Sequence, residues 1–505
     1  MEEHILSASH TGVVDPRHIV RQMLGIDAVR RQAIISVGAN IGVTLVGYIA
    51  TVYIAHVAGA EILGAYYLFL AYYSLAILGA DGGLGGAAVK KISEGKDEDA
   101  YFTAQAMIRL VLLILCIAII VVVLSPFMKD FAGAGLIPWL ILALAAGSLS
   151  GIISTGVYGG GKIGALQVSE LASHVVRVIV QIAAVYAGFS IAGMAGGFVV
   201  GVCAALVINV RFLHFRITAF RWEHVREMFP YAGWGFLTAL AGVLVAYADT
   251  VLVGYFLDST EVGFYRAPMQ LATLALFVST SLSMSLFPRI SRWNEEHNVE
   301  YIRHAVSRAL SYSLVLAVPL VAGGLILAER LLYFLYGSPF VVATAAFSLI
   351  LAAQIGMVIF TLDTMVLGAL GQPRAIFILN ALSAVLLVLL EVFMIPGFGI
   401  TGAATALLVT CIARAAGARW VLSRHVHIGV ERRVIGNILA ATMVMAVFII
   451  GFRVLFSVFH VAVLILVIAA GALVFFLVLF RLDRTIHDEI CELATHLGIP
   501  WPSWL

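Results

Sequence analysis

The chain has 505 residues, of which 62% are hydrophobic and 11% are charged, against roughly 25% charged in a soluble globular domain. This balance excludes a soluble enzyme and a disordered chain. The 30 Lys and Arg residues nearly match the 28 Asp and Glu residues, so the chain has no overall field that would attract a nucleic acid.

Apolar runs as long as a bilayer core recur along the whole chain. A spanning helix needs about 20 apolar residues, and windows of that length predict fourteen spans. They cover residues 33–56, 61–80, 105–127, 136–158, 167–187, 189–210, 232–256, 262–286, 309–328, 341–369, 375–395, 398–420, 434–456 and 460–480. These spans leave only short loops and two tails, so we expect an all-α polytopic membrane protein.

The distribution of basic residues predicts the side of the membrane on which each loop lies. With the N-terminus in the cytoplasm, 23 Lys and Arg residues fall on the cytoplasmic side, and only Lys129, Arg330 and Arg453 fall outside. Cytoplasmic loops are enriched in Lys and Arg. We therefore expect both termini to lie in the cytoplasm.

Both tails carry apolar residues at helical spacing. We expect an interfacial helix after Asp15 within the N-terminal segment 1–32, and an amphipathic tail over 481–505. For the C-terminal tail, docking on a partner is the alternative. The four cysteines are scattered, and no spacing among them suggests a metal site.

The first half of the chain aligns with the second. Glu61–Tyr66 aligns with Thr260–Tyr265 at an offset of 199, and Gly188–Gly193 aligns with Gly397–Gly402 at an offset of 209. The matches occur in sequence order and at equivalent topological positions, which indicates an internal duplication of one six-span unit.

The duplication predicts the domain organisation. Residues 33–212 form a first lobe, 213–229 a cytoplasmic linker and 230–423 a second lobe, while 424–480 add spans 13 and 14. Because six spans return the chain to its starting side, the two pseudo-symmetric bundles are related by an axis along the membrane normal. We expect a central cavity between them.

A polar stripe lies in the fifth span. Glu170, His174, Arg177 and Gln181 are spaced four, three and four residues apart, which places them on one helix face. Charges inside a membrane are costly and mark functional sites. We interpret the stripe as a cavity wall on which Arg177 binds an anionic head group and Glu170 with His174 modulates this binding. An internal salt bridge with a hydrogen-bonded histidine is the structural alternative.

A second set of intramembrane charges lies in the second lobe. Asp249 in span 7 and Arg266 in span 8 sit below the same turn and can pair, either as a structural ion pair or as a site where substrate or a coupling ion competes. Arg414, Asp363 and Glu391 complete this set. The equivalent positions of the first lobe do not carry these charges, which favours an asymmetric role.

Four basic residues lie at the cytoplasmic ends of spans. Lys90, Lys91, Arg109 and Arg308 occupy this layer, where long side chains reach the interface at low cost. We expect them to anchor the spans and to guide anionic head groups.

A glycine-rich stretch imitates a phosphate-binding loop. Gly156–Lys162 fits the start of that motif, but Ile163 stands where a Ser or Thr would bind Mg²⁺. The stretch also follows a membrane span instead of a strand. We therefore expect a turn here and no use of ATP.

Three stretches carry a family resemblance: Gly82–Lys96 after span 2, and Ala248–Phe256 with Val262–Tyr265 around the turn between spans 7 and 8. With twelve duplicated spans and two extra ones, the chain resembles the multidrug/oligosaccharidyl-lipid/polysaccharide exporter superfamily. Within it, the chain is similar to the polysaccharide-type (Wzx-like) flippases.

The resemblance implies a flippase in a prokaryotic plasma (inner) membrane. Such a protein moves polyprenyl-(di)phosphate-linked oligosaccharide from the cytoplasmic to the outer leaflet by alternating access, for export of cell-surface glycans. The two extra helices would form a groove for the isoprenoid tail. Expected partners are the lipid-linked oligosaccharide, membrane lipids and glycan assembly or polymerising enzymes, with no nucleic acid.

These implications assign roles to the intramembrane charges. Substrate binding falls to Arg177, Arg266, Arg414 and His174. Coupling to H⁺ or Na⁺ falls to Asp249, Glu170, Asp363 and Glu391.

Two other functions are alternatives to a flippase. A cation-coupled multidrug antiporter of the same superfamily is the alternative, although its cavity should be aromatic or acidic. A membrane glycan enzyme needs a sizeable aqueous domain, whereas the predicted outer loops have about a dozen residues or fewer, so we expect no catalytic activity.

Overall fold

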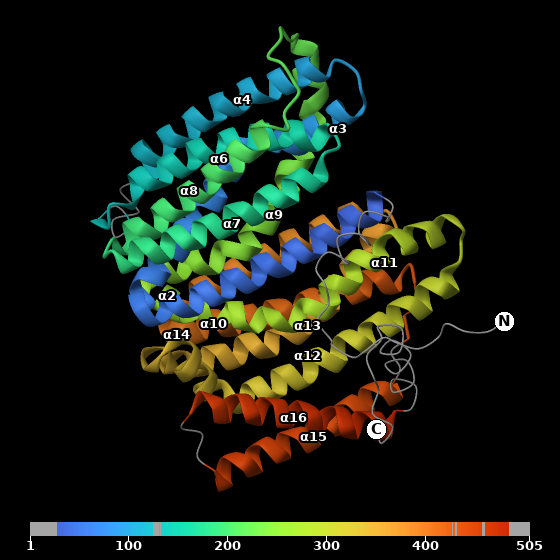
Figure 1. The fold of residues 1–505 in the computed structure, drawn as a ribbon. Coiled ribbons are helices and arrows are strands. Elements are labelled where there is room, and N and C mark those ends of the chain that lie inside the picture. The colour runs from blue at the N-terminus through green and yellow to red at the C-terminus, as the bar shows by residue number, and fades with distance from the viewer. Residues whose placement is uncertain are drawn as a thin grey trace, which may run out of the picture.

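The computed structural model describes residues 28–124, 131, 133–426, 428–429, 432–456 and 460–483 (Figure 1). The predicted interfacial helices of the two tails lie outside these residues. The described residues form helices and turns without a strand. The elements are α2 (Ala28–Asp81), α3 (Leu84–Ser93), α4 (Glu98–Ile119), η1 (Ile120–Leu124), α6 (Leu136–Gly159), α7 (Ile163–Tyr186), α8 (Ser190–Val210), α9 (Trp222–Phe256), α10 (Ser259–Ala272), η3 (Thr273–Leu276), α11 (Phe277–Glu295), α12 (Val299–Tyr336), η4 (Ser338–Ala343), α13 (Thr344–Ala369), α14 (Pro373–Ser423), α15 (Arg432–Leu455) and α16 (Val461–Leu482).

Twelve helices of the described part are long and apolar enough to cross a membrane, which confirms the all-α polytopic class. Two of them, α2 and α14, are longer than one crossing requires. Their backbones leave the helical region at Gly59 (φ 81°) and Gly399 (φ 58°), where the positive φ favours glycine. Each glycine lies at or next to a predicted boundary between two spans. The count of fourteen crossings stays a prediction.

Several helices continue beyond the predicted spans. Helix α9 begins at Trp222 inside the predicted linker, and α11 and α12 occupy most of the predicted loop over 287–308. The apolar run matches the thickness of the bilayer, but a helix continues past it where its backbone groups are satisfied. At the start of α9, the backbone N–H of Arg221 donates to Nδ1 of His224 at 3.0 Å.

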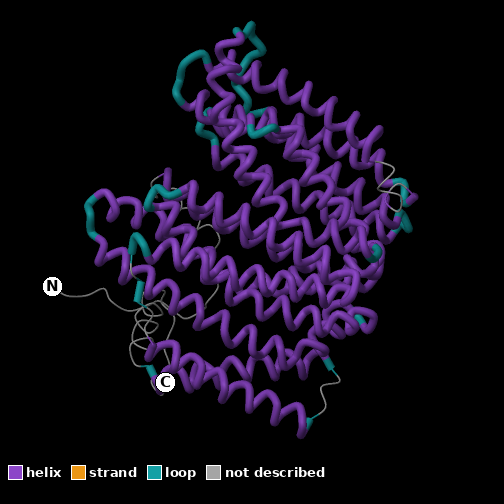
Figure 2. Tube along the Cα trace, turned by 180° about the vertical axis from the view of Figure 1, so that it is seen from behind, coloured by secondary structure: helices purple, strands orange, loops and turns teal. Residues whose placement is uncertain are grey.

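The helices form three groups (Figures 1 and 2). Helices α3, α4 and α6–α8 lie on one side, α10–α14 lie in the middle, and α15 and α16 cover the far side. Helices α2 and α9 contact both of the first two groups. One buried core joins the first two groups, with Leu63 and Phe69 of α2 in the same cluster as Tyr265 and Phe347. A second core attaches α16 to α12 and α13. The first two groups diverge towards the ends of α3 and α11.

Candidate functional site

A polar pocket of about 530 Å³ lies among the helices of the first group. Helices α6, α7 and α8 form it, together with Tyr73 of α2. Its lining combines a guanidinium, an imidazole, a carboxylate, hydroxyls and an amide at the depth of the predicted spans. The polar lining residues are Tyr73, Ser150, Ser154, Tyr158, Gln167, Ser169, Glu170, Ser173, His174, Arg177 and Asn209.

Three residues of the predicted stripe line this pocket. The guanidinium of Arg177 contacts Nδ1 of His174 one turn away and lies 5.9 Å from the ring centre of Phe198. Glu170 is exposed and makes no ion pair with another described residue. Gln181 instead donates to the carbonyl of Met194 at 2.9 Å and is buried, so it fastens α7 to α8.

Two glycines of α8 set the position of Arg177. A Cβ on Gly201 would fall 2.8 Å from Cβ of Arg177, and a Cβ on Gly197 would fall 2.5 Å from Cγ of Gln181. Helices approach this closely only where one of them presents small residues. The close packing directs the Arg177 side chain into the pocket.

The predicted pairing of Asp249 with Arg266 is present at the junction of α9 and α10. Nη1 of Arg266 lies 3.6 Å from Oδ2 of Asp249, whose side chain is 2% exposed. The other carboxylate oxygen accepts hydrogen bonds from the backbone N–H and the hydroxyl of Thr250, at 2.6 Å and 3.0 Å. Arg266 is flanked by the rings of Tyr67 and Tyr247, 5.9 Å and 5.4 Å from their centres.

Glu391 of α14 adds a second buried carboxylate to this pair. Glu391 is 0% exposed. Neither of its carboxylate oxygens has a hydrogen-bond partner among the described residues. The negative charge of Asp249 acts on it. If both carboxylates were ionised, the single arginine would leave one negative charge without a compensating group, which is costly in a buried site.

The other predicted residues of the second lobe lie elsewhere. Arg414 donates to Oδ1 of Asn380 at 3.0 Å and lies 4.0 Å from the ring centre of Phe360. Asp363 pairs with Nε of Arg419 at 3.0 Å. No described contact joins Arg177, Arg266 and Arg414, so within the described residues the predicted set of cavity cations does not form one cluster.

The prediction for Arg109 was wrong in its geometry. Arg109 does not extend to the interface but is 6% exposed and pairs with Asp81 at the end of α2. A buried guanidinium needs a carboxylate partner, and the sequence offers one where α2 ends. Arg308, in contrast, is exposed on α12.

Lys90 and Lys91 of α3 both contact the first turns of α9. Nζ of Lys91 lies 2.8 Å from Oε2 of Glu227, and Lys90 contacts Tyr231. The hydroxyl of Tyr101 donates to the same Glu227 oxygen at 2.5 Å. The hydrogen bond from Lys91 to Glu227 raises the pKa of the lysine above its ordinary value. The two lysines thus fasten α3 to α9, a role that spacing alone did not indicate.

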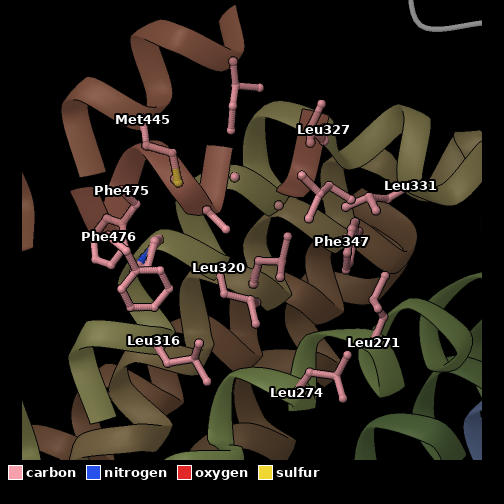
Figure 3. Close-up of a pocket in the computed structure, with 17 residues that line it drawn as sticks. Leu271, Leu274, Leu316, Leu320, Leu327, Leu331, Phe347, Met445, Phe475 and Phe476 are labelled. Atoms are coloured by element: carbon pink, nitrogen blue, oxygen red, sulfur yellow. The ribbon is translucent and has the colours of Figure 1, made fainter. Parts of the chain in front are cut away.

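An apolar pocket of about 300 Å³ lies between α12 and the pair α15–α16 (Figure 3). Leu320 and Leu327 of α12 face Met445 of α15 and Phe475 of α16 across it. Gly323 and Gly324 leave room on the α12 side. No sequence signal marks these residues, because leucine occurs in every predicted span.

Long apolar helices with arginine and carboxylate sites inside them define a polytopic membrane protein with polar sites between its helices. Residues 57–345 match the polysaccharide biosynthesis protein family, and the chain belongs to this family. The family resemblance predicted from the sequence is thereby confirmed.

Two curated relatives come from Haloferax volcanii. The chain is 24% identical over 441 residues to the "Probable low-salt glycan biosynthesis flippase Agl15", covering 86% of this chain and 92% of the relative. It is also 24% identical over 482 residues to the "Probable flippase AglR", covering 92% and 98%.

Solved structures share the fold. The lipid II flippase MurJ in an inward closed conformation superposes with a TM-score of 0.73 at 17% identity, over 89% of this chain and 99% of that chain. An inward-facing multidrug resistance MATE family transporter of the MOP superfamily gives 0.61 at 14% identity, over 78% and 98%.

Proposed function

We propose that this protein is a flippase that moves polyprenyl-(di)phosphate-linked oligosaccharide from the cytoplasmic to the outer leaflet by alternating access. The observation that carries the proposal is the pocket around Arg177, which sets a cation among hydroxyls and an amide inside apolar helices. Both curated relatives are named as flippases, one of them in glycan biosynthesis. Transport changes no covalent bond, so the protein has no catalytic residues.

Arg177 supplies the chemistry that a phosphate requires. Its guanidinium donates bidentately to phosphate oxygens, while the hydroxyls of Ser150, Ser154 and Ser173 and the amide of Asn209 suit the hydroxyl groups of a sugar. His174 contacts Arg177 and orients it. An inside-negative potential favours outward movement of the anion by about 2.3 kcal/mol per charge at 100 mV.

The apolar pocket beside α15 and α16 suits the isoprenoid tail. Its labelled side chains in Figure 3 are leucines, phenylalanines and one methionine, which make the contacts that a branched hydrocarbon needs. The head group and the tail of one substrate would therefore occupy different helix groups.

Asp249 and Glu391 couple transport to H⁺ or Na⁺. With Arg266 present, one buried negative charge remains, and a proton or a cation neutralises it. Carboxylate oxygens are also the ligands that hard cations prefer. Substitution of Glu391 by Gln removes this charge and should abolish the dependence of transport on an ion gradient.

We place the protein in the plasma (inner) membrane with both termini in the cytoplasm, where glycan assembly enzymes supply the lipid-linked substrate. The positive-inside distribution supports this orientation. The alternative function, a cation-coupled multidrug antiporter, is less well supported, because Arg177 would repel a cationic drug from the polar pocket.

Transport in proteoliposomes tests the proposal. A polyprenyl-diphosphate oligosaccharide is loaded on one side, and its appearance on the other side is followed for wild type, Arg177→Ala and Arg177→Lys. We expect Arg177→Ala to slow flipping by about ten- to a hundredfold and Arg177→Lys to retain part of it, since one charged hydrogen bond contributes about 1.5–3 kcal/mol. Uptake of a cationic dye without lipid flipping would support the antiporter instead.

A further inference from the structure

A separate groove of about 1170 Å³ opens between α4 and the first half of α9. It shares no lining residue with the pocket of Arg177. Gly79 near the end of α2 and Gly82 just after it also line the groove. Its apolar walls include Met107, Val111, Leu112, Trp222, Phe229 and Phe236.

The walls of this groove are apolar yet open to the surroundings. Val111 is 65% exposed, Phe229 is 72% exposed and Trp222 is 75% exposed. A Cβ on Gly233, which also lines the groove, would meet no atom within 4 Å. At the edge of a membrane span, such a surface is in contact with lipid chains, and tryptophan prefers the depth of the head groups.

One charged residue lines the groove. Arg226 lies one turn from Trp222 on the same face of α9. It is exposed and makes no ion pair or side-chain hydrogen bond with another described residue. The adjacent carboxylate, Glu227, points to the other face and is held by Lys91 and Tyr101. Within the described part of the chain, this guanidinium therefore has no charged partner, and it lies at the rim of an apolar groove.

We propose that this groove binds an anionic membrane phospholipid from the leaflet on the side of α3, the predicted cytoplasmic side. The acyl chains lie against α4 and α9, and the head-group phosphate accepts hydrogen bonds from Arg226. Basic pockets at the ends of spans recognise anionic head groups in this way, and guanidinium matches phosphate oxygens bidentately. The site is independent of the flipped substrate and of the polar pocket.

The fluorescence of Trp222 reports on this site in the full chain in detergent micelles. The probe is phosphatidylglycerol with brominated acyl chains, compared with phosphatidylcholine carrying the same chains. The Trp222→Phe variant gives the signal of the other tryptophans, which is subtracted. We expect the Trp222 component to be quenched at an about fivefold lower concentration of the anionic lipid.

Three variants separate a built site from ordinary lipid contact. Arg226→Gln should remove the fivefold preference for the anionic lipid, whereas Arg211→Gln, which removes an exposed charge outside the groove, should keep it. Gly233→Leu fills the groove and should weaken quenching by both lipids. Equal quenching by the two lipids in wild type, or a preference that survives Arg226→Gln, would overturn the proposal.

Discussion

Gly64 of α2 and Gly263 of α10 lie against each other, so that a Cβ on Gly64 would fall 2.6 Å from the backbone nitrogen of Gly263. The offset of 199 aligns these two glycines in the two sequence copies. The same offset aligns Tyr67 with Arg266, which also contact each other. Residues that lie next to a pseudo-twofold axis contact their own equivalents in the other copy. Both contacts therefore agree with the predicted axis along the membrane normal, and the axis itself stays a prediction.

The contact between these glycines predicts that neither position tolerates a side chain. In Gly263→Ala the new Cβ would overlap the carbonyl of Ala60, and we expect a loss of about 1–3 kcal/mol or more, because backbone cannot move aside as a side chain can. The midpoint of thermal unfolding in detergent measures this loss. Gly451→Ala is the control, since its Cβ would meet no atom within 4 Å. Equal midpoints for the two variants would contradict the close approach.

The Asp249–Arg266 pair predicts a large difference between single and double variants. Arg266→Ala leaves a buried carboxylate without its partner, and we expect a loss of about 3–5 kcal/mol in the free energy of unfolding. The double variant Asp249→Asn with Arg266→Gln removes both charges and should recover most of that loss. Denaturant titration of the two proteins measures the difference.

An exposed ion pair serves as the control for this comparison. Arg303 lies 3.0 Å from Glu300, with both side chains about half exposed to solvent. Arg303→Ala should change the free energy of unfolding by less than about 1 kcal/mol, because exposed pairs contribute little. If Arg303→Ala lost as much stability as Arg266→Ala, the burial of Asp249 could not be the cause of the large loss in Arg266→Ala.

The contact between α3 and α9 predicts local loosening in Glu227→Gln. The substitution removes the ion pair with Lys91, and we expect amide hydrogen exchange over residues 222–236 to rise by a few fold. The pKa of Lys91 is raised in the folded protein. The contribution of Lys91 to the free energy of unfolding is therefore fully present below its ordinary pKa of 10.5, and it is lost as the pH rises through the raised pKa. Glu223→Gln, a nearby exposed carboxylate without a described ion pair, should leave exchange unchanged.

Filling the polar pocket should stop transport without unfolding the protein. Ser150 lines the pocket and is half-buried, so the indole in Ser150→Trp would occupy the space of the substrate. We expect flipping in proteoliposomes to fall by at least tenfold, while thermal unfolding changes little. Leu149→Trp is a matched control on the adjacent, exposed position. Retained flipping by Ser150→Trp would place the substrate outside this pocket.

The apolar pocket predicts a variant that acts on the tail alone. A Cβ on Gly323 has only ordinary contacts, 3.8 Å from Met445 and 3.9 Å from Ile449, so Gly323→Phe projects into the space shown in Figure 3. We expect flipping of a long polyprenyl substrate to fall several fold more than flipping of a short-chain analogue. Gly451→Phe, at an open position of α15, should affect both substrates equally.

Local patterns were sufficient to predict the class of the protein and part of the site. Apolar run length determines whether a segment enters a bilayer, and helical spacing determines which residues share a face. For this reason the stripe of Glu170, His174 and Arg177 and the pairing of Asp249 with Arg266 could be predicted from residue positions. The same patterns indicated the boundary near Gly59.

Tertiary structure decided which neighbour each face meets. Residue spacing did not indicate that Gln181 bonds to α8 instead of lining the pocket. It also did not indicate that the charge of Asp249 acts on Glu391, or that Arg109 is buried. Asp81 ends α2 and Arg109 lies in α4, and only the packing of α2, α4 and α6 brings them together. The chain by itself therefore determined the helices and their polar faces, because these depend on neighbouring residues. The pairing of those faces depends on contacts between distant segments, which only the folded protein specifies.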